Sequence, residues 1–405
     1  MVHIVDRITL DDATTGTQTG TVAEPSFATS GLRTIVVGNF FTTRTRDGGA
    51  TWRFADPLTT FPPAGDGICT DQLMIYVRRR RLWVWLLQYG PLAGTNVFRL
   101  AASRTGAPGT WTTWDFAPTD MDPALGGLWF DYPHLGTTEE HLWVSFNLFT
   151  THNAWARAAV MRFPLDDLTA KGPLRRTVWT TAETGSLRFV EGAGDEMIFA
   201  GHRHDNTALV LHAWPDADTT VSSWTLPVRP WNDRGYNSAL PDGSTWLGRI
   251  DGRITGAWRA RGMLGFAWTA ADEPGRDHPY VRIARFDEDT LDLVDEPDLS
   301  SVRGAYAYPA VAANRRGDVG LAAFFGGPHH PSHVVGTLEE SGGAPLWSIA
   351  EVARSTHAPT QGRWGDHLTC RPHPTRRTSW LATGFTLQGG NDRRHVEPTL
   401  TEFRP

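Results

Sequence analysis

The sequence is poor in cysteine and in long apolar runs. Cys69 and Cys370 are the only cysteines in 405 residues, which excludes a framework of several disulfide bonds. No apolar run approaches the roughly 20 residues that a membrane-spanning helix needs, so we expect no such helix and no membrane partner. Residues 1–6 show no charged segment followed by an apolar one. This predicts no signal peptide in the chain, and it leaves open a cytoplasmic protein or a secreted mature form.

Positive charge is not in excess either. The chain has 38 Lys and Arg against 44 Asp and Glu, a formal net charge of −6, and Lys171 is its only lysine. Nucleic-acid binding needs a basic face, so we expect no nucleic-acid partner. The one basic run, Arg78–Arg81, lies between two strand-like segments and is predicted to be a solvated hairpin turn.

The residues that are abundant favour strands and turns. There are 18 Trp, 19 Phe, 41 Gly and 27 Pro, and no long stretch of helix-forming residues. An apolar run that ends in an aromatic or polar loop recurs seven times, with first positions 49, 60, 55, 67, 56 and 60 residues apart. The seven runs are residues 32–39, 81–89, 141–149, 196–204, 263–270, 319–326 and 379–386.

This repeat predicts an all-β fold, a seven-bladed β-propeller of four-stranded antiparallel blades. About four strands recur in about 57 residues, which is the length of a propeller blade. We expect a single domain over 1–405, with blades at approximately 24–66, 67–127, 128–182, 183–246, 247–302, 303–360 and 361–405. The last blade lacks one strand, and residues 4–10 are predicted to supply it and close the ring. The alternative is two β-sandwich domains, but no linker divides the chain.

In this arrangement the two cysteines are expected to be free thiols. Cys69 begins the second blade and Cys370 lies in the inner strand of the seventh, so the first blade separates them. A disulfide bond needs Cα atoms within about 7 Å, less than the expected distance between non-adjacent inner strands.

One hairpin turn carries a recognisable motif. Residues 45–52, Thr-Arg-Asp-Gly-Gly-Ala-Thr-Trp, fit the pattern S/T-x-D-x-G-x-T-W, the Asp box or bacterial neuraminidase repeat. The chain therefore resembles the sialidase-like β-propeller superfamily, and residues 103–111 resemble a degenerate second copy. The resemblance implies the propeller fold and a structural role for Asp47. It implies no single activity, because the superfamily includes sialidases, other glycosidases, lyases and non-catalytic propellers, and the Arg-Ile-Pro motif of sialidases is absent here.

Propeller geometry predicts where functional side chains gather. The first residues of every inner strand and the loops after every second strand meet at one mouth of the central channel, where ligand sites are common. The candidate catalytic residues are Asp71, Asp131, Tyr132, Tyr306 and Asp366. The candidate substrate-binding residues are Arg188, Arg253, Arg363, Trp129, Trp364, Gln88, His202 and His329, with the two histidines expected at the rim of the pocket.

Three chemistries fit these residue types. The arginines could hold a carboxylate or sulfate. The aspartates could form an acid/base pair for glycoside hydrolysis, although an aspartate at such a position also commonly caps a turn. Tyrosine and histidine beside arginine suit β-elimination on a uronate. We expect no cofactor to be required; a divalent metal held by His202 and His204 with other loop histidines is the alternative.

The sequence thus predicts a carbohydrate-active enzyme, a glycoside hydrolase or a polysaccharide or uronate lyase. Its substrate would be a small molecule or glycan, anionic or polyhydroxylated, and Trp129 and Trp364 could stack on sugar rings. The alternatives are a lyase, isomerase or cyclase of specialised metabolism acting on a non-sugar, and a non-catalytic lectin or interaction propeller. A lectin would repeat its binding residues in every blade, whereas the segments that begin the blades differ here.

Overall fold

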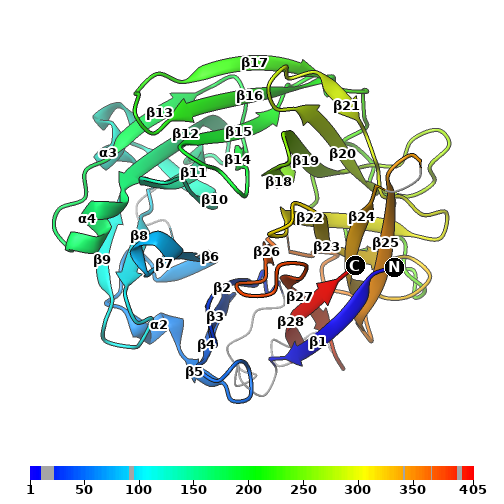
Figure 1. The fold of residues 1–405 in the computed structure, drawn as a ribbon, viewed down its shortest axis with the longest axis horizontal. Coiled ribbons are helices and arrows are strands. Elements are labelled where there is room, and N and C mark those ends of the chain that lie inside the picture. The colour runs from blue at the N-terminus through cyan, green and yellow to red at the C-terminus, as the bar shows by residue number, and fades with distance from the viewer. Residues whose placement is uncertain (11–21, 91–94, 341–342, 366, 390–394) are drawn as a thin grey trace.

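The chain forms a closed ring of β-sheets around a central channel (Figure 1). The structure is a computed structural model that describes residues 1–10, 22–90, 95–340, 343–365, 367–389 and 395–405. The described residues form seven four-stranded sheets, and neighbouring strands in each are antiparallel. The predicted seven-bladed propeller is therefore confirmed.

The strands follow one another along the chain from the channel outwards in the first three blades. Blade one contains β2 (Ser26–Ser30), β3 (Arg33–Gly38), β4 (Phe41–Thr45) and β5 (Arg53–Ala55). Blade two contains β6 (Ile68–Val77), β7 (Leu82–Tyr89), β8 (Phe98–Ser103) and β9 (Thr112–Phe116). Blade three contains β10 (Leu128–Thr137), β11 (His141–Thr150), β12 (Trp155–Pro164) and β13 (Thr177–Thr181).

The next three blades repeat this order. Blade four contains β14 (Arg188–Phe189), β15 (Glu196–His202), β16 (Ala208–Pro215) and β17 (Ser222–Pro227). Blade five contains β18 (Ile254–Ala260), β19 (Met263–Ala270), β20 (Tyr280–Asp287) and β21 (Leu293–Asp295). Blade six contains β22 (Ala305–Ala313), β23 (Val319–Gly326), β24 (Ser332–Glu339) and β25 (Leu346–Arg354).

Blade seven joins the two ends of the chain. It contains β26 (Cys370–Pro372), β27 (Trp380–Leu387), β28 (Val396–Arg404) and β1 (His3–Thr9). β1 pairs with β28, with His3 opposite Arg404 and Thr9 opposite Thr399, so the N- and C-termini lie side by side (Figure 1). The prediction that the N-terminal strand closes the ring is confirmed.

The few helices are short and lie in the connections. They are α2 (Pro57–Thr60), α3 (Pro118–Met121), α4 (Leu165–Ala170) and the 3-10 turns η1 (Arg78–Arg80) and η2 (Pro123–Leu125). None of the described helices is long and apolar enough to cross a membrane.

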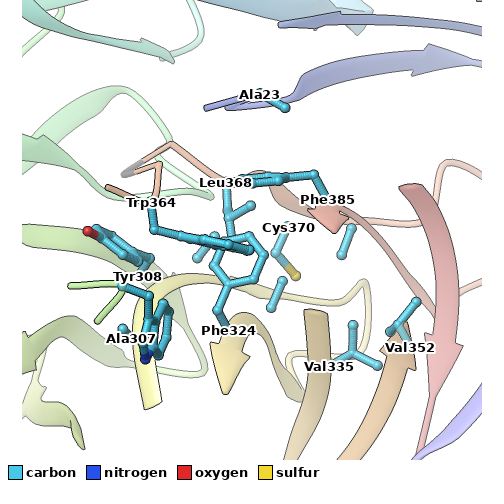
Figure 2. Packing of buried hydrophobic residues seen from close by; sticks show 14 of the residues in the cluster. Ala23, Ala307, Tyr308, Phe324, Val335, Val352, Trp364, Leu368, Cys370 and Phe385 are labelled. Carbon is cyan, nitrogen blue, oxygen red and sulfur yellow. The ribbon is translucent and has the colours of Figure 1, made fainter. Parts of the chain in front are cut away.

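The hydrophobic core lies between the blades, where large aromatic side chains fill the space between neighbouring sheets. Between blades six and seven, Trp364 stacks on Phe385 with ring centroids 4.8 Å apart, and Phe324 contacts both rings (Figure 2). A Cβ atom at Gly320 would come within 2.5 Å of the Trp380 indole. Glycine at this position therefore allows a blade to pack directly against a tryptophan of the next one.

The Asp47 turn is stabilised by hydrogen bonds to the Asp47 carboxylate. The Asp47 carboxylate accepts hydrogen bonds from the Thr51 N–H (2.9 Å), the Thr51 hydroxyl (2.5 Å) and the Thr45 hydroxyl (2.7 Å). These bonds lower the pKa of Asp47, and the bond from the Thr51 hydroxyl has the largest effect. Trp52 packs half-buried where blade one meets blade seven.

Cys69 and Cys370 are free thiols, as predicted.

Candidate active site

The inner strands share a distortion at the end of the channel where the predicted residues lie. Five blades place a non-glycine residue there in the left-handed backbone region: Glu24 (φ 45°), Asp71 (φ 52°), Tyr132 (φ 53°), Ser186 (φ 51°) and Tyr308 (φ 56°). In β6, β10 and β22 the strand register shifts at this residue, which is the mark of a β-bulge. Bulges redirect side chains and are common beside active sites, and this conformation is rare for residues as large as tyrosine.

Side chains from the preceding blade hold these residues in place. The Asn39 side-chain oxygen accepts the N–H of Asp71 (3.1 Å), and the Thr269 hydroxyl accepts the N–H of Tyr308 (3.0 Å). The Asn147 side-chain oxygen accepts the N–H of Ser186 in the same way (2.7 Å). Asn39 directly follows the second strand of its blade, and Asn147 and Thr269 lie near the end of theirs, so in these three cases a blade positions one residue of the next.

Tyr132 is the centre of the most closely packed group of polar side chains here. Its ring lies 4.9 Å from the His367 ring, and the Arg253 guanidinium lies over its face, 4.2 Å from the centroid. The Nε2 atom of His367 is 3.8 Å from the Asp71 carboxylate. We call Asp71, Tyr132, Arg253 and His367 the mouth cluster; its members come from blades two, three, five and seven.

Arg188 lies next to the mouth cluster, on a small cavity between inner strands. The cavity has a volume of about 20 Å³, enough for one water molecule, and it is lined in part by Arg188, His134, Glu191, His367 and Arg371. Burial lowers the pKa of Arg188, while Tyr132 and Glu191 act in the opposite direction. Within the described residues, Arg188 makes no ion pair, and its Nε atom is buried without a hydrogen-bond partner. A group the size of a sugar ring does not fit into this cavity.

The other groups on the cavity are held by the fold. Arg371 donates hydrogen bonds to the backbone oxygens of Phe27 and Met74. The Nδ1 atom of His134 accepts the N–H of Phe189 (3.1 Å). Burial, with the positive charge of Arg188 nearby, keeps the pKa of His134 well below its usual value, so this ring is neutral and serves to join blades three and four.

Two further aspartates, Asp251 and Asp131, lie near members of the mouth cluster. Arg253 binds the Asp251 carboxylate through two hydrogen bonds of 2.6 and 2.5 Å. Asp131 is half-buried, close enough to Cys69 to affect its thiol. Burial raises the pKa of Cys69, and the charges of Asp71 and Asp131 raise it further. Asp71 and Asp131 are therefore both near Cys69, at the start of blade two.

Two predicted residues, Gln88 and Trp364, are instead buried where neighbouring blades meet. The Gln88 amide is buried and donates to the backbone oxygen of Phe130 (3.1 Å), which joins blade two to blade three. Trp364 is 3% exposed within the core between blades six and seven, so it offers no face to a sugar. The prediction that Trp364 stacks on sugar rings is therefore wrong, because the indole is covered by the core (Figure 2).

His202 is likewise not at the rim. It packs against Trp231 and Trp268, each with ring centroids 4.8 Å away, and both of its ring nitrogens are covered. Burial lowers its pKa to about 3, so the imidazole is neutral at neutral pH. The strand alternation that suggested a paired site with His204 did not account for the two tryptophans that cover His202.

The remaining described candidates for substrate binding are Trp129, His329 and Arg363. Trp129 is half-buried and stacks on Phe149 (5.3 Å), and His329 lies 3.5 Å from the Glu351 carboxylate. Arg363 is exposed. Asp366 lies outside the described residues. Among the described residues, no group of three His, Cys, Asp or Glu side chains is arranged to hold a metal ion.

Tyr308 and His367 are the residues that the sequence reasoning missed. Tyr306 packs half-buried against Phe325 (4.6 Å), whereas Tyr308 has the left-handed position that Tyr132 has in blade three. A signal was present, because Tyr-Pro occurs at both 132–133 and 308–309. His367 directly follows Asp366, and only the aspartate was given weight.

Comparisons with known proteins leave the reaction open. No family model and no curated protein matches the sequence. Among solved structures, the GH93 α-L-arabinofuranosidase of Fusarium graminearum is similar over 95% of this chain and 93% of its own, at 11% identity and a TM-score of 0.49. The α-L-arabinanase of Penicillium chrysogenum is similar over 79% and 89%, at 10% identity and a TM-score of 0.45. A subtype N10 neuraminidase-like protein of a bat influenza A virus is similar over 80% and 95%, at 10% identity and a TM-score of 0.42. Likeness at this level carries no argument about what this chain does.

Proposed function

We propose that this protein is a carbohydrate-active enzyme, a lyase that cleaves a uronate-containing glycan by β-elimination at the channel mouth. One observation carries the proposal: Tyr132 is held in a left-handed bulge against His367 and Arg253, and its side chain contacts the buried Arg188. Strained, closely packed polar residues of this kind are typical of active sites. The arrangement supplies an acid, a base and positive charge within one group.

Substrate binding is assigned to the arginines. Arg188 has no ion-pair partner in the described part of the chain, lines the cavity and contacts Tyr132, so it is suited to receive a substrate carboxylate. Arg253 is positioned by Asp251 and adds a second positive charge beside Tyr132. Neutralising the carboxylate makes the hydrogen on the adjacent carbon easier to remove, because negative charge develops on the carboxyl group as the proton leaves.

His367 and Tyr132 are assigned the two proton transfers. His367, oriented by Asp71, removes the proton from the carbon next to the carboxylate, and the electron pair of that C–H bond forms a carbon–carbon double bond. The bond from the next carbon to the glycosidic oxygen breaks, and Tyr132 gives its proton to that oxygen. Arg253, over the phenol ring, stabilises the phenolate that forms. A proton then passes from His367 to Tyr132, whose rings are in contact, and both groups return to their starting states.

Glycoside hydrolysis is the second candidate. It requires two carboxyl groups on either side of the scissile bond, and Asp71 and Asp131 both lie near Cys69. The lyase is favoured because Asp71 is already engaged with His367, whereas Tyr132, His367 and two arginines form one group. A lectin is disfavoured because the mouth cluster is asymmetric and takes different residues from each blade.

The test is a screen that separates the two bond-breaking reactions. Uronate glycans such as polygalacturonate and hyaluronan are incubated with the protein, with arabinan and sialyllactose as comparisons. Both new reducing ends and the ultraviolet absorbance of a conjugated double bond are measured. We expect the two signals to rise together on a uronate glycan. Reducing ends without absorbance would establish the hydrolase, and binding without either signal would establish the lectin.

A further inference from the structure

A cleft on the outer side of the propeller, between blades one and two, has the character of a second binding site. It is lined by Arg44 and Arg53 from β4 and β5, by Trp85 from β7, and by Thr43 and Trp111 among others; no Asp or Glu lines it. The channel is lined by inner strands, so this cleft is distinct from the mouth cluster.

Positive charge is concentrated at the cleft without compensation. Arg44 and Arg53 are directly opposite each other across β4 and β5. Like charges at such paired positions destabilise a sheet. The pKa of Arg44 is lowered mainly by burial, and further by the charges of Arg46 and Arg53. Among the described residues, these three arginines make no ion pair.

Residues that line the cleft also carry unused hydrogen-bond donors, the Thr43 hydroxyl among them. The Nη1 atom of Arg44 and the Nε1 atom of Trp85 are buried and have no hydrogen-bond partner. Guanidinium and indole nitrogens can only donate, so they require an acceptor. Burying a donor without an acceptor is costly, which makes such groups in a folded protein a sign of a missing ligand or water.

We propose that this cleft binds an oxyanion, a sulfate or phosphate group, either as the free ion or as an ester on a larger molecule. Such a group supplies both the negative charge that Arg44 and Arg53 lack and acceptors for Arg44 and Trp85. The enclosed part of the cleft is about 20 Å³, the size of one oxygen-sized group. The rest of the oxyanion therefore faces solvent, where the exposed Arg53 lies, and this leaves room for an ester linkage.

The experiment is calorimetric titration of the full chain with inorganic phosphate and with sulfate, at an ionic strength kept constant with chloride. Arg53→Gln is the main variant, because an exposed residue is not expected to be needed for folding. Arg33→Gln is its matched control: Arg33 is also exposed on blade one but does not line the cleft. Trp85→Phe removes the indole donor and keeps an aromatic ring.

We expect Arg53→Gln to weaken oxyanion binding by about tenfold or more, as for the loss of a charge-assisted contact, while Arg33→Gln leaves the affinity within about twofold. Glucose 6-sulfate then distinguishes the sources: binding tighter than that of inorganic sulfate identifies an ester, and weaker binding identifies the free ion. The proposal is overturned if neither ion binds, or if Arg33→Gln weakens binding as much as Arg53→Gln. Activity at the mouth is not measured, so this result is independent of the proposed reaction.

Discussion

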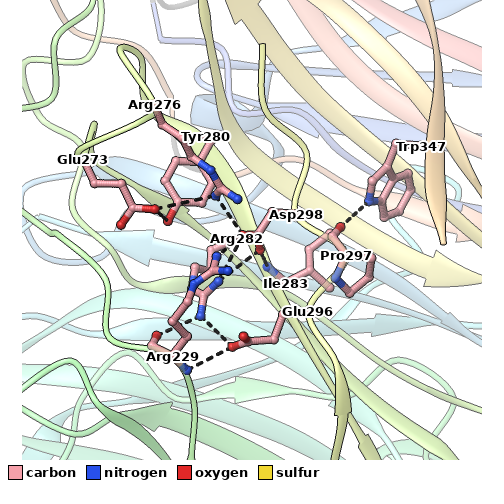
Figure 3. A network of polar contacts seen from close by, with 10 residues as sticks. All are labelled: Arg229, Glu273, Arg276, Tyr280, Arg282, Ile283, Glu296, Pro297, Asp298 and Trp347. Atoms are coloured by element: carbon pink, nitrogen blue, oxygen red, sulfur yellow. Dashed lines mark hydrogen bonds and ion pairs between the residues drawn. The ribbon is translucent and has the colours of Figure 1, made fainter. Parts of the chain in front are cut away.

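Arg188 and Arg282 are both buried arginines, and their surroundings differ sharply. Arg282, in β20, donates to the Asp298 carboxylate (3.0 Å), the Glu296 carboxylate (2.5 Å) and the backbone oxygen of Arg229 (2.8 Å), as Figure 3 shows. Arg188 hydrogen-bonds to the side chain of Tyr132, makes no ion pair with a carboxylate among the described residues, and lines a cavity. A buried charge with matching partners serves the fold, whereas one that lacks them is available to a ligand.

The network around Arg282 also ties blade five together and to its neighbour. Asp298 accepts from Arg276 (2.8 Å), and the Tyr280 hydroxyl donates to Glu273 (2.9 Å). The Trp347 indole of blade six donates to the Pro297 oxygen in the same segment (2.8 Å; Figure 3). In the mouth cluster, the contact between His367 and Asp71 is longer, at 3.8 Å.

The largest effect should come from truncating the paired arginine. Arg282→Ala would leave Asp298 and Glu296 without their buried partner and should lower the free energy of unfolding by about 3–5 kcal/mol. Arg188→Ala should change it by less than about 1 kcal/mol, because no pair is broken. Chemical denaturation of both variants measures the difference. Equal losses of stability would remove the distinction between the two arginines.

The next effect separates two tyrosines by function. Tyr132→Phe removes the proposed acid and should lower turnover of the uronate substrate by about 10²–10⁴-fold, with little change in melting temperature. Tyr280→Phe loses only the bond to Glu273, so it should lower the free energy of unfolding by about 1 kcal/mol and leave turnover unchanged. Steady-state kinetics and thermal melts of both variants test this. A fully active Tyr132→Phe protein would remove Tyr132 from the mechanism.

The smallest effect concerns a buried side chain that carries no charge when folded. The pKa of His202 is about 3 in the folded protein, against a usual value near 6.5, so protons bind more strongly to the unfolded chain. The stability that neutral His202 contributes to the folded state is fully present above pH 6.5. As the pH falls toward 3, the free energy of unfolding decreases by about 1.4 kcal/mol per pH unit. His202→Phe should therefore lose less stability than the wild type between pH 6.5 and 4.5.

His204→Gln is the control for this measurement, because His204 is exposed two residues away. It should keep the wild-type dependence of unfolding free energy on pH. If His202→Phe also kept the full wild-type slope, His202 would not be the buried group that is responsible.

The propeller was predictable from the sequence because a blade leaves a local and repeated pattern. Apolar second strands recur at near-constant spacing, and the unpaired segment at residues 4–10 matches the strand missing from the last blade. The candidate site was predictable only by region. Asp71, Tyr132, Arg188 and Arg253 do converge, since the start of each inner strand reaches the same mouth.

What the sequence did not specify is which way each side chain points. A bulge reverses strand alternation locally, so Tyr308 and not Tyr306 takes the position equivalent to Tyr132. Long-range packing decides the rest: Trp364 and His202 are covered by residues far away in the chain, Phe324 and Trp268 among them. Neither effect has a signal in the few residues around the side chain concerned.

The pairing of β1 with β28 has a consequence for the order of folding. The last sheet needs both the first and the last strand, so it cannot be complete until nearly the whole chain has been synthesised. Bringing such distant strands together costs loop entropy, which increases slowly with length, and the cost is recovered only when the ring closes. Six sheets can assemble from neighbouring segments, whereas the seventh forms only when strands from both ends of the chain pair. A permuted chain with its ends joined and a new opening between two other blades should therefore fold with a different final step.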